Sequence, residues 1–186
     1  MSDTNKMKKG FNSVYIATSL DGYIADADNS IVFLDTFPIA EGTDMGYDTF
    51  MSNIDALLMG RKTFETVLGF GIEWPYTKPV FVWSHTLTSV PKDLETKVQL
   101  VTGYTKEVLQ SIHQKGFERL YIDGGQVIQS LLKENLIDEM IITTIPVVLG
   151  SGIPLFRETK QMLKFRCTGS KTFDNGLCQQ VYEKIN

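Results

Sequence analysis

The segment ALLMGRKTFE, residues 56–65, passes from a short apolar run through one glycine into a more polar stretch. Four consecutive apolar residues, Ala56–Met59, are typical of a strand buried on both faces of a sheet. Gly60 ends this strand, and a helix is expected over Thr63–Leu68, closed by Gly69. A strand that turns at a glycine into a helix is the repeating unit of α/β domains, so the segment predicts that fold class.

The same alternation of short apolar strands and helical segments extends along most of the chain. Strands are expected at Phe11–Thr18, Ala56–Met59, Pro79–Trp83, Val98–Val101 and Arg119–Ile122. Helices are expected at Thr43–Ile54, capped by Thr43 or Asp44, and at Thr63–Leu68, Lys106–Lys115 and Val127–Glu134. Residues 19–30 are expected to form a loop. This order predicts a three-layer domain with a largely parallel sheet and helices on both faces.

The C-terminal part of the chain has a different pattern. Residues 139–149 form a long β-branched run, and Lys164–Thr172 and Leu177–Lys184 flank the turn signal Asp174-Asn175-Gly176. Because Asn-Gly between two β-rich runs indicates a hairpin, we expect antiparallel strands at the edge of a mixed, mostly parallel sheet. Residues 1–10 are polar and are expected to form a flexible tail, which leaves residues 11–186 as a single domain.

Composition places the domain among mildly acidic globular proteins. The 186 residues include 18 Lys+Arg and 22 Asp+Glu, for a net charge of −4, and 42% of them are hydrophobic. A net negative charge argues against nucleic-acid binding, which needs clustered basic residues. No apolar run approaches the roughly 20 residues of a membrane span, and the N-terminus lacks the apolar core of a signal peptide. We therefore expect a cytoplasmic protein with neither a nucleic acid nor a membrane as its partner.

Cysteine and histidine are too few for a zinc site. Cys167 and Cys178 could face each other across the C-terminal hairpin, and in a chain without an export signal we interpret them as buried, reduced thiols. His85 and His113 cannot form a metal cluster by themselves, and neither CxxC nor HExxH occurs. No metal is expected.

Two strand ends have the composition of an anion site. In Gly60-Arg61-Lys62-Thr63 the glycine lets the backbone approach a ligand, the next helix offers free N–H groups, and two cations add charge. Asp123-Gly124-Gly125-Gln126 stands in the same position before the next helix. The simpler alternatives are a capped helix and a tight turn. Two such turns in one sheet would suit a dinucleotide, although neither the GxGxxG fingerprint nor a P-loop occurs.

Further polar residues could contact a ligand at this edge of the sheet. Trp83-Ser84-His85-Thr86 follows a buried strand and could bind a ribose or a 2′-phosphate, or form a simple loop. The acids best placed for polar contacts are Asp21, Asp44, Asp48 and Asp123. The alternatives are turn residues for Asp21 and Asp123, and acids of a first helical turn for Asp44 and Asp48.

Together these motifs resemble the dihydrofolate reductase superfamily. The similarity is closest to the reductase domain of bifunctional riboflavin-biosynthesis deaminase-reductases and their single-domain relatives. The segments that carry it are SLDGYIA (19–25), LMGRKTFE (58–65), VWS (82–84), YIDGG (121–125), IDE (137–139) and PVVLGSG (146–152). In order and spacing they span nearly the whole chain.

This resemblance implies an oxidoreductase that uses NADPH. Arg61 and Thr63 match family positions that contact the cofactor phosphates, and Ser84 matches a position near the adenosine phosphate. Gly124 and Gly125 match the turn that holds the pyrophosphate. The resemblance also implies cofactor contacts for Gly60, Gln126 and Val127, positions beside the nicotinamide for Ala17 and Ile24, and a position near the substrate for Asp123.

The sequence also departs from parts of the family pattern. The stretch Thr43–Asp48 lacks the tryptophan that dihydrofolate reductases carry near the first helix, and neither Asp44 nor Asp48 is a clean match to their substrate-binding acid. The zinc-binding deaminase domain of the bifunctional enzymes is also missing. We therefore expect a stand-alone reductase of a pyrimidine- or pterin-like heterocycle, of the 5-amino-6-(5-phosphoribosylamino)uracil reductase type. Asp21 or Asp123 would bond the heterocycle or its ribose.

Two other functions stay open, and so do two interpretations of the run Met140–Leu149. The alternatives to the riboflavin-type reductase are a dihydrofolate reductase and an NADPH-binding protein without turnover. A homodimer is expected, since the run Met140–Leu149 could present an edge or a face to a second copy. The alternative is that this run is a central buried strand.

Overall fold

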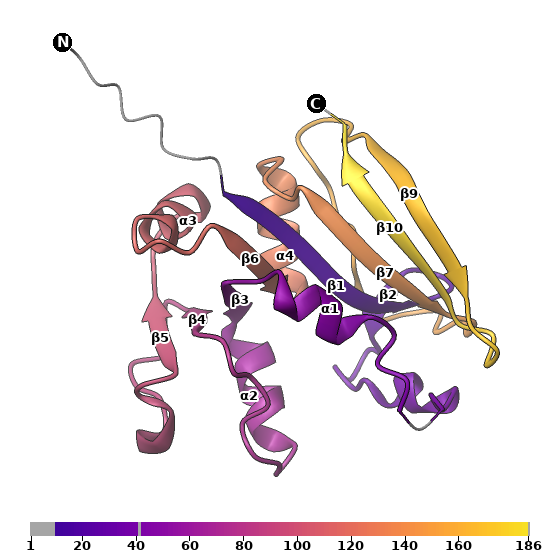
Figure 1. Cartoon of the computed structure of the whole chain (residues 1–186), viewed down its shortest axis with the longest axis horizontal. Helices are drawn as coiled ribbons and strands as arrows, with labels where there is room; N and C mark the ends of the chain where they lie inside the picture. Colours follow the sequence, from indigo (N-terminus) through magenta and orange to yellow (C-terminus); the bar gives the residue numbers. More distant parts are fainter. Residues whose placement is uncertain (1–9, 41, 186) are drawn as a thin grey trace.

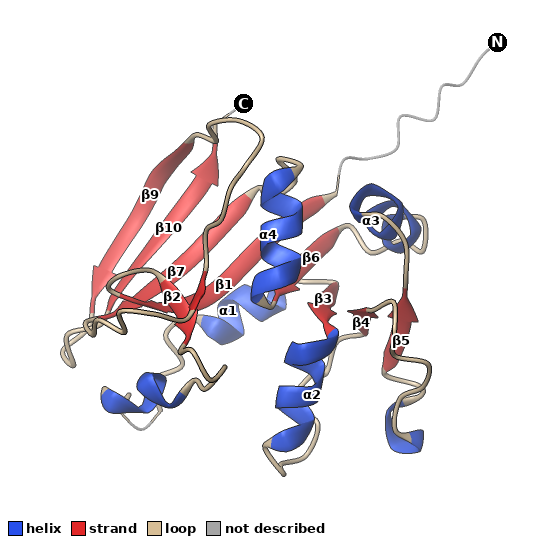
Figure 2. Cartoon of the chain, turned by 180° about the vertical axis from the view of Figure 1, so that it is seen from behind, coloured by secondary structure: helices blue, strands red, loops and turns tan. Residues whose placement is uncertain are grey.

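The computed structural model describes residues 10–40 and 42–185. These residues form one large sheet with helices against both of its faces (Figure 1; Figure 2). Of the tail expected at residues 1–10, only Gly10 belongs to the described part. No helix in that part is both long enough and apolar enough to cross a bilayer.

The large sheet has eight strands in the order β5-β4-β3-β6-β1-β7-β10-β9. They are β1 (Phe11–Ser19), β3 (Ala56–Gly60), β4 (Val80–Trp83), β5 (Val98–Val101), β6 (Arg119–Asp123), β7 (Glu139–Ile145), β9 (Phe165–Thr172) and β10 (Cys178–Lys184). All pairs from β5 to β7 are parallel, whereas β10 is antiparallel to both β7 and β9. The predicted mixed, mostly parallel sheet with a C-terminal antiparallel hairpin is confirmed.

Alternate strand residues build a hydrophobic core on each face of the sheet. On one face, Leu57 and Met59 pack with Phe50 of α1 (Tyr47–Ser52) and Phe64 of α2 (Arg61–Gly69). On the other face, Leu58 packs with the buried residues of α3 (Thr105–His113) and α4 (Gly125–Lys133). The period-two alternation of the strands therefore produces the predicted three layers.

Several element boundaries differ from those expected, and three of the differences bear on the site. The loop expected over residues 19–30 contains a short strand, β2 (Tyr23–Ala25), which pairs with β8 (Ile153–Pro154). Helix α1 is shorter than expected because Gly46, at φ +88°, stands at its N-cap. Asp44 nevertheless accepts hydrogen bonds from the N–H groups of Gly46 and Asp48, both at 2.9 Å. Helix α2 begins two residues early, at Arg61. Short 3-10 helices lie at Val32–Thr36 and Lys92–Leu94.

The C-terminal elements correct two expectations. β7 lies between β1 and β10, so the β-branched run forms an internal strand and cannot present an edge to a second copy, although a face of it stays partly accessible. The run leaves the strand after Ile145. The two cysteines are free thiols, but they do not face each other, because Cys167 pairs with Tyr182 and Cys178 with Thr172. The expectation that they are buried is also wrong, since Cys167 is exposed and Cys178 is only partly buried.

Candidate functional site

The candidate site lies where β3, β4 and β6 end. These parallel strands bring their carboxyl ends to one edge of the sheet. Helix α2 starts directly after Gly60, and α4 starts directly after Gly124. Two helix N-termini therefore lie at this edge, and the unpaired N–H groups of a helix N-terminus favour a bound anion.

The two strand-to-helix turns are packed closely together. A Cβ atom at Gly124 would lie 2.2 Å from Thr63 Oγ1, and Gly124 has φ +86°, so only glycine fits without strain. A Cβ atom at Gly125 would lie 2.6 Å from Ile24 Cδ1, and one at Gly60 would lie 3.3 Å from Val127 Cγ2. The structure thus gathers Ile24, Gly60, Thr63, Gly124, Gly125 and Val127 in one place. All six are residues that the sequence predicted to bind the cofactor.

Beside these turns is a cavity of about 360 Å³ with basic and hydroxyl groups in its lining. Its residues are Gly60, Arg61, Lys62, Trp83, Ser84, His85, Thr86, Gln126, Val127 and Ser130. Five of the predicted cofactor residues are among them. Ala17 lies apart from this cavity, in β1, where it packs against a small cluster around Phe33.

Two side chains of the cavity that the sequence predicts to bind phosphate, Arg61 and Ser84, are already engaged by the protein. Arg61 donates to Glu65 Oε1 of the same helix at 3.0 Å, in an exposed pair that leaves other guanidinium N–H groups for a ligand. Ser84 Oγ accepts hydrogen bonds from the backbone N–H groups of Thr86 (3.1 Å) and Leu87 (2.9 Å). The Ser84 hydroxyl therefore shapes the turn after β4 and can still donate its own proton.

Several residues that line the cavity were missing from the predicted cofactor set. Trp83, His85 and Thr86 belong to the polar cluster noted in the sequence, and Lys62 belongs to the first anion segment. Ser130 carried no motif, but it stands one helical turn after Gln126, whose carbonyl accepts its hydroxyl at 2.7 Å. Helical spacing from the Gly-Gly turn is the signal that could have identified it.

Asp123 lies at the same edge, on the sheet face that carries α1. It follows Tyr121 by two residues, and successive side chains of a strand alternate between faces. The Gly124 N–H donates to Asp123 Oδ1 at 2.8 Å. The residue keeps some exposed surface, but desolvation of its carboxyl group raises the pKa of Asp123 to about 6, against the lowering effect of the Gly124 bond. The carboxyl group can therefore hold or release a proton near neutral pH.

Three tyrosines lie near enough to this carboxyl group for its charge to raise their pKa values. Burial first, and then the negative charge of Asp123, raise the pKa of Tyr47 to about 12 and also raise the pKa values of Tyr76 and Tyr121. The rings of Tyr47 and Tyr121 lie 6.5 Å apart between centroids, and those of Tyr15 and Tyr47 lie 5.4 Å apart. These hydroxyls stay protonated at neutral pH. The sequence did not indicate this group of tyrosines, because Tyr15, Tyr47, Tyr76 and Tyr121 come from four separate segments.

Asp21 occupies a tight polar turn. Its carboxylate accepts hydrogen bonds from Ser19 Oγ (2.6 Å), the Leu149 N–H (3.1 Å) and the Gly150 N–H (2.8 Å). The bond from Ser19 and those from the two backbone groups hold the pKa of Asp21 below its usual value. The carboxylate therefore ties the turn after β1 to the loop after β7.

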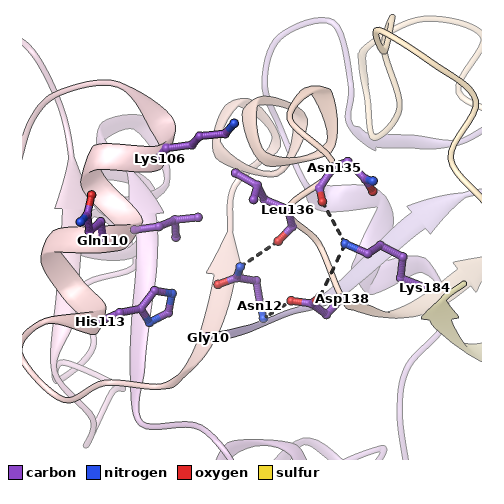
Figure 3. Close-up of a pocket in the computed structure, with 10 residues that line it drawn as sticks. Gly10, Asn12, Lys106, Gln110, His113, Asn135, Leu136, Asp138 and Lys184 are labelled. Carbon is purple, nitrogen blue, oxygen red and sulfur yellow. Dashed lines mark hydrogen bonds and ion pairs between the residues drawn. The ribbon is translucent and has the colours of Figure 1, made fainter. Parts of the chain in front are cut away.

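A second cavity, of about 430 Å³, lies at the opposite end of β1 (Figure 3). There Asn12 Nδ2 donates to the Leu136 carbonyl at 2.8 Å, and Lys184 Nζ lies 3.7 Å from Asp138 Oδ1. These contacts join the start of β1 to the segment after α4 and to the end of β10. The cavity is larger than the first, but it lies away from the paired glycine turns and Asp123. Among residues 10–40 and 42–185, no three His, Cys, Asp or Glu side chains are grouped as metal ligands.

The chain is similar to known proteins over nearly its whole length. The model of the RibD C-terminal domain family matches residues 13–179. A putative riboflavin biosynthesis protein of Shewanella sp. PV-4 is 46% identical, with a TM-score of 0.91 over 95% of this chain and 99% of that one. YwjB of Bacillus subtilis is 38% identical over 86% of this chain and 90% of its own length. Dihydrofolate reductase of Enterococcus faecalis, solved with NADP(H), shares the fold at 16% identity, with a TM-score of 0.63 over 96% and 98% of the two chains.

Proposed function

The chain belongs to the RibD C-terminal domain family, a family of reductase domains, and from that premise we propose that it reduces a pyrimidine- or pterin-like heterocycle with NADPH. The reaction is a hydride transfer of the 5-amino-6-(5-phosphoribosylamino)uracil reductase type, as in riboflavin biosynthesis. We propose a cytoplasmic location for it. The partner is a small heterocyclic molecule, with neither nucleic acid nor membrane involved.

The residues at the carboxyl edge fit NADPH. Gly60 and Gly124 stand at the N-termini of two helices, whose free N–H groups favour an anion, and Arg61, Lys62 and His85 line the cavity beside them. Arg61 and Ser84 would hold the 2′-phosphate, and the turn at Gly124 and Gly125, with Thr63, Gly60, Gln126 and Val127, would hold the pyrophosphate. Ala17 and Ile24 would flank the nicotinamide. When bound, the cofactor supplies the hydride, and the protein positions the reacting groups.

Asp123 carries the proposal. A carboxyl group with a pKa of about 6, beside the turns that would hold the cofactor, can bond the heterocycle and give a proton to the atom next to the reduced carbon. For Asp21, whose oxygens accept three hydrogen bonds from the protein, we propose a positioning role. It would hold the turn before Ile24 against the loop at Leu149 and Gly150.

The test is the loss of NADPH absorbance with a panel of ribosylamino-pyrimidines, pterins and dihydrofolate. We expect turnover with a ribosylamino-pyrimidine, and Asp123→Asn should lower kcat by about 10²–10⁴-fold while leaving NADPH affinity near its original value. Asp93→Asn, an exposed acid of the 3-10 helix at Lys92–Leu94, is the control. Turnover of dihydrofolate alone would favour a dihydrofolate reductase. NADPH binding without turnover of any compound would favour a binding protein, and absence of NADPH binding would refute the proposal.

A further inference from the structure

Gln179 of β10 lies on the same face of the sheet as Asp123, and we propose that its side-chain oxygen binds an N–H group of the substrate heterocycle. This inference rests on the proposed function and names a residue that determines its specificity. Gln179 is the register partner of Thr143, and Thr143 is the register partner of Ala17, which would flank the nicotinamide. The three residues therefore form a row across β1, β7 and β10.

The row belongs to the side of the sheet that carries α1. Ile141 packs with the core on that side, and Thr143 follows it by two residues along β7, so the two side chains point the same way. Gln179 bonds Thr143 from the neighbouring strand and shares that face. β1 and β7 lie between the strands of Asp123 and Gln179, so these strands are about 14 Å apart. Allowing for the length of the two side chains, a ribosylamino-pyrimidine can span this separation.

The hydroxyl group of Tyr15 determines the orientation of the Gln179 carboxamide. Tyr15 Oη donates to the Met45 carbonyl at 3.0 Å, because a carbonyl oxygen can only accept. The Tyr15 oxygen must therefore act as an acceptor toward Gln179, whose Nε2 lies 3.1 Å away. Gln179 Nε2 also donates to Thr143 Oγ1 at 3.1 Å. Both N–H groups of the carboxamide are thus used, and its oxygen points away from these partners.

This oxygen is the part of the carboxamide that a ligand can use. Gln179 Oε1 accepts no hydrogen bond from the described part of the chain, and it is not fully buried. Thr143 Oγ1 accepts from Gln179, while its own proton has no acceptor among the described residues. An acceptor and a donor therefore stand next to each other at this point of the sheet. They match the edge of a lactam, in which an N–H group stands beside a carbonyl group.

The uracil ring of the proposed substrate type has such an edge. In 5-amino-6-(5-phosphoribosylamino)uracil, N3–H lies between two carbonyl groups and directly opposite the ring carbon that carries the ribosylamino chain. When the reacting carbon of that chain lies at Asp123, N3–H is the part of the ring directed toward β10. N3–H then donates to Gln179 Oε1, and one of the two carbonyl groups accepts from the Thr143 hydroxyl.

The deciding experiment compares this compound with its N3-methyl derivative, in the wild type and in Gln179→Ala. Kd is measured by fluorescence quenching with NADP⁺ bound, and kcat and KM are measured from NADPH consumption. In the wild type, the methyl group should raise Kd at least about tenfold, because it leaves Gln179 Oε1 without its donor. Gln179→Ala should raise Kd for the unmethylated compound by a similar factor. The methyl group should then add less than about twofold, and the Kd for NADPH should stay unchanged.

Gln180→Ala is the matched control. Gln180 is the next residue of β10, points to the opposite face and accepts the Tyr182 hydroxyl at 2.8 Å, so its loss should change neither Kd. If the methyl group has no effect in the wild type, or an undiminished effect in Gln179→Ala, the inference is overturned and the proposed reductase stands. The wild-type comparison decides this even where the variant folds poorly. If the wild type neither binds nor reduces the unmethylated compound, the proposed function fails and the inference falls with it.

Discussion

At the scale of single residues, the proposed chemistry of Asp123 works against the stability of the fold. Desolvation raises the pKa of its carboxyl group from 3.8 to about 6 in the folded state. Between these values the folded chain binds more protons than the unfolded chain, so stability falls as the pH rises through that window. Two pKa units correspond to about 3 kcal/mol, an upper bound because Asp123 keeps some exposed surface.

Asp123→Asn should therefore stabilise the protein where the wild-type carboxyl group is ionised. The amide oxygen can still accept the Gly124 N–H, and no charge has to be buried. We expect the free energy of unfolding in urea to rise by about 1–3 kcal/mol at pH 8 and to change little at pH 4. Asp93→Asn is the exposed control. An equal effect of Asp123→Asn at both pH values would contradict the shifted pKa.

Arg61 makes a prediction about the choice of cofactor. If its guanidinium holds the 2′-phosphate, Arg61→Ala should weaken the binding of NADPH by about 1–3 kcal/mol, or roughly 5- to 150-fold in Kd. The binding of NADH should hardly change. Fluorescence titration with both nucleotides measures the difference. Arg166→Ala, in the distant edge strand β9, should change neither affinity. If the binding of NADPH and that of NADH weakened equally, the hypothesis that Arg61 binds the 2′-phosphate would be wrong.

At the scale of elements, the turns that precede α2 and α4 pack against each other and determine the shape of the carboxyl edge of the sheet. Gly124→Ala would place a methyl group 2.2 Å from Thr63 Oγ1 at a φ of +86°. We expect it to lower the free energy of unfolding by about 2–4 kcal/mol. Thr63→Ala in the same chain should recover about 1 kcal/mol, because the hydroxyl is gone and the backbone strain remains.

Gly176→Ala separates the two causes of that loss. Gly176 also has a φ of +86° but no atom within 4 Å of the added methyl group, so Gly176→Ala gives the cost of a positive φ without a steric clash, at about 1–2 kcal/mol. Urea unfolding of the wild type, Gly124→Ala, Thr63→Ala and the double variant measures the coupling between the two sites, and Gly176→Ala is measured beside them. If Gly124→Ala cost no more than Gly176→Ala, the two turns would not be packed as described.

Much of this edge could be predicted from the sequence because the two glycine turns are local patterns. Gly60, Gly124 and Gly125 each stand where a strand meets a helix, and parallel strands must bring such turns together. The tyrosines near Asp123 could not be predicted in this way. Tyr47 and Tyr76 come near Asp123 only after α1 and the segment before β4 fold over the sheet. The length of α1 was also predicted wrongly. The spacing of apolar residues indicated a helix from Thr43, but the N-cap is Gly46, so the helix begins at Tyr47.

At the scale of the whole molecule, the helices cover only part of the sheet. α1 and α2 on one face and α3 and α4 on the other pack over the half of the sheet that contains β3, β4 and β6. No helix lies over β9 and β10 in either view (Figure 1; Figure 2). β7 is paired along both of its edges, so a second copy cannot add a strand to it. If β7 contributes to the predicted homodimer, it does so through a face of the sheet that it shares with β9 and β10.

The partly buried pair Ile141 and Val181 marks that face. The two residues are register partners on β7 and β10, and Ile141 packs with the core on the α1 side. We expect light scattering to give about twice the chain mass of 20.9 kDa, and Val181→Glu to give one chain mass, because dimerisation would bury the new charge. Tyr104→Glu, at an exposed position before α3, should leave the dimer intact. A wild-type mass near one chain at micromolar concentration would refute the dimer, whereas a dimer that survives Val181→Glu would move the interface to another surface.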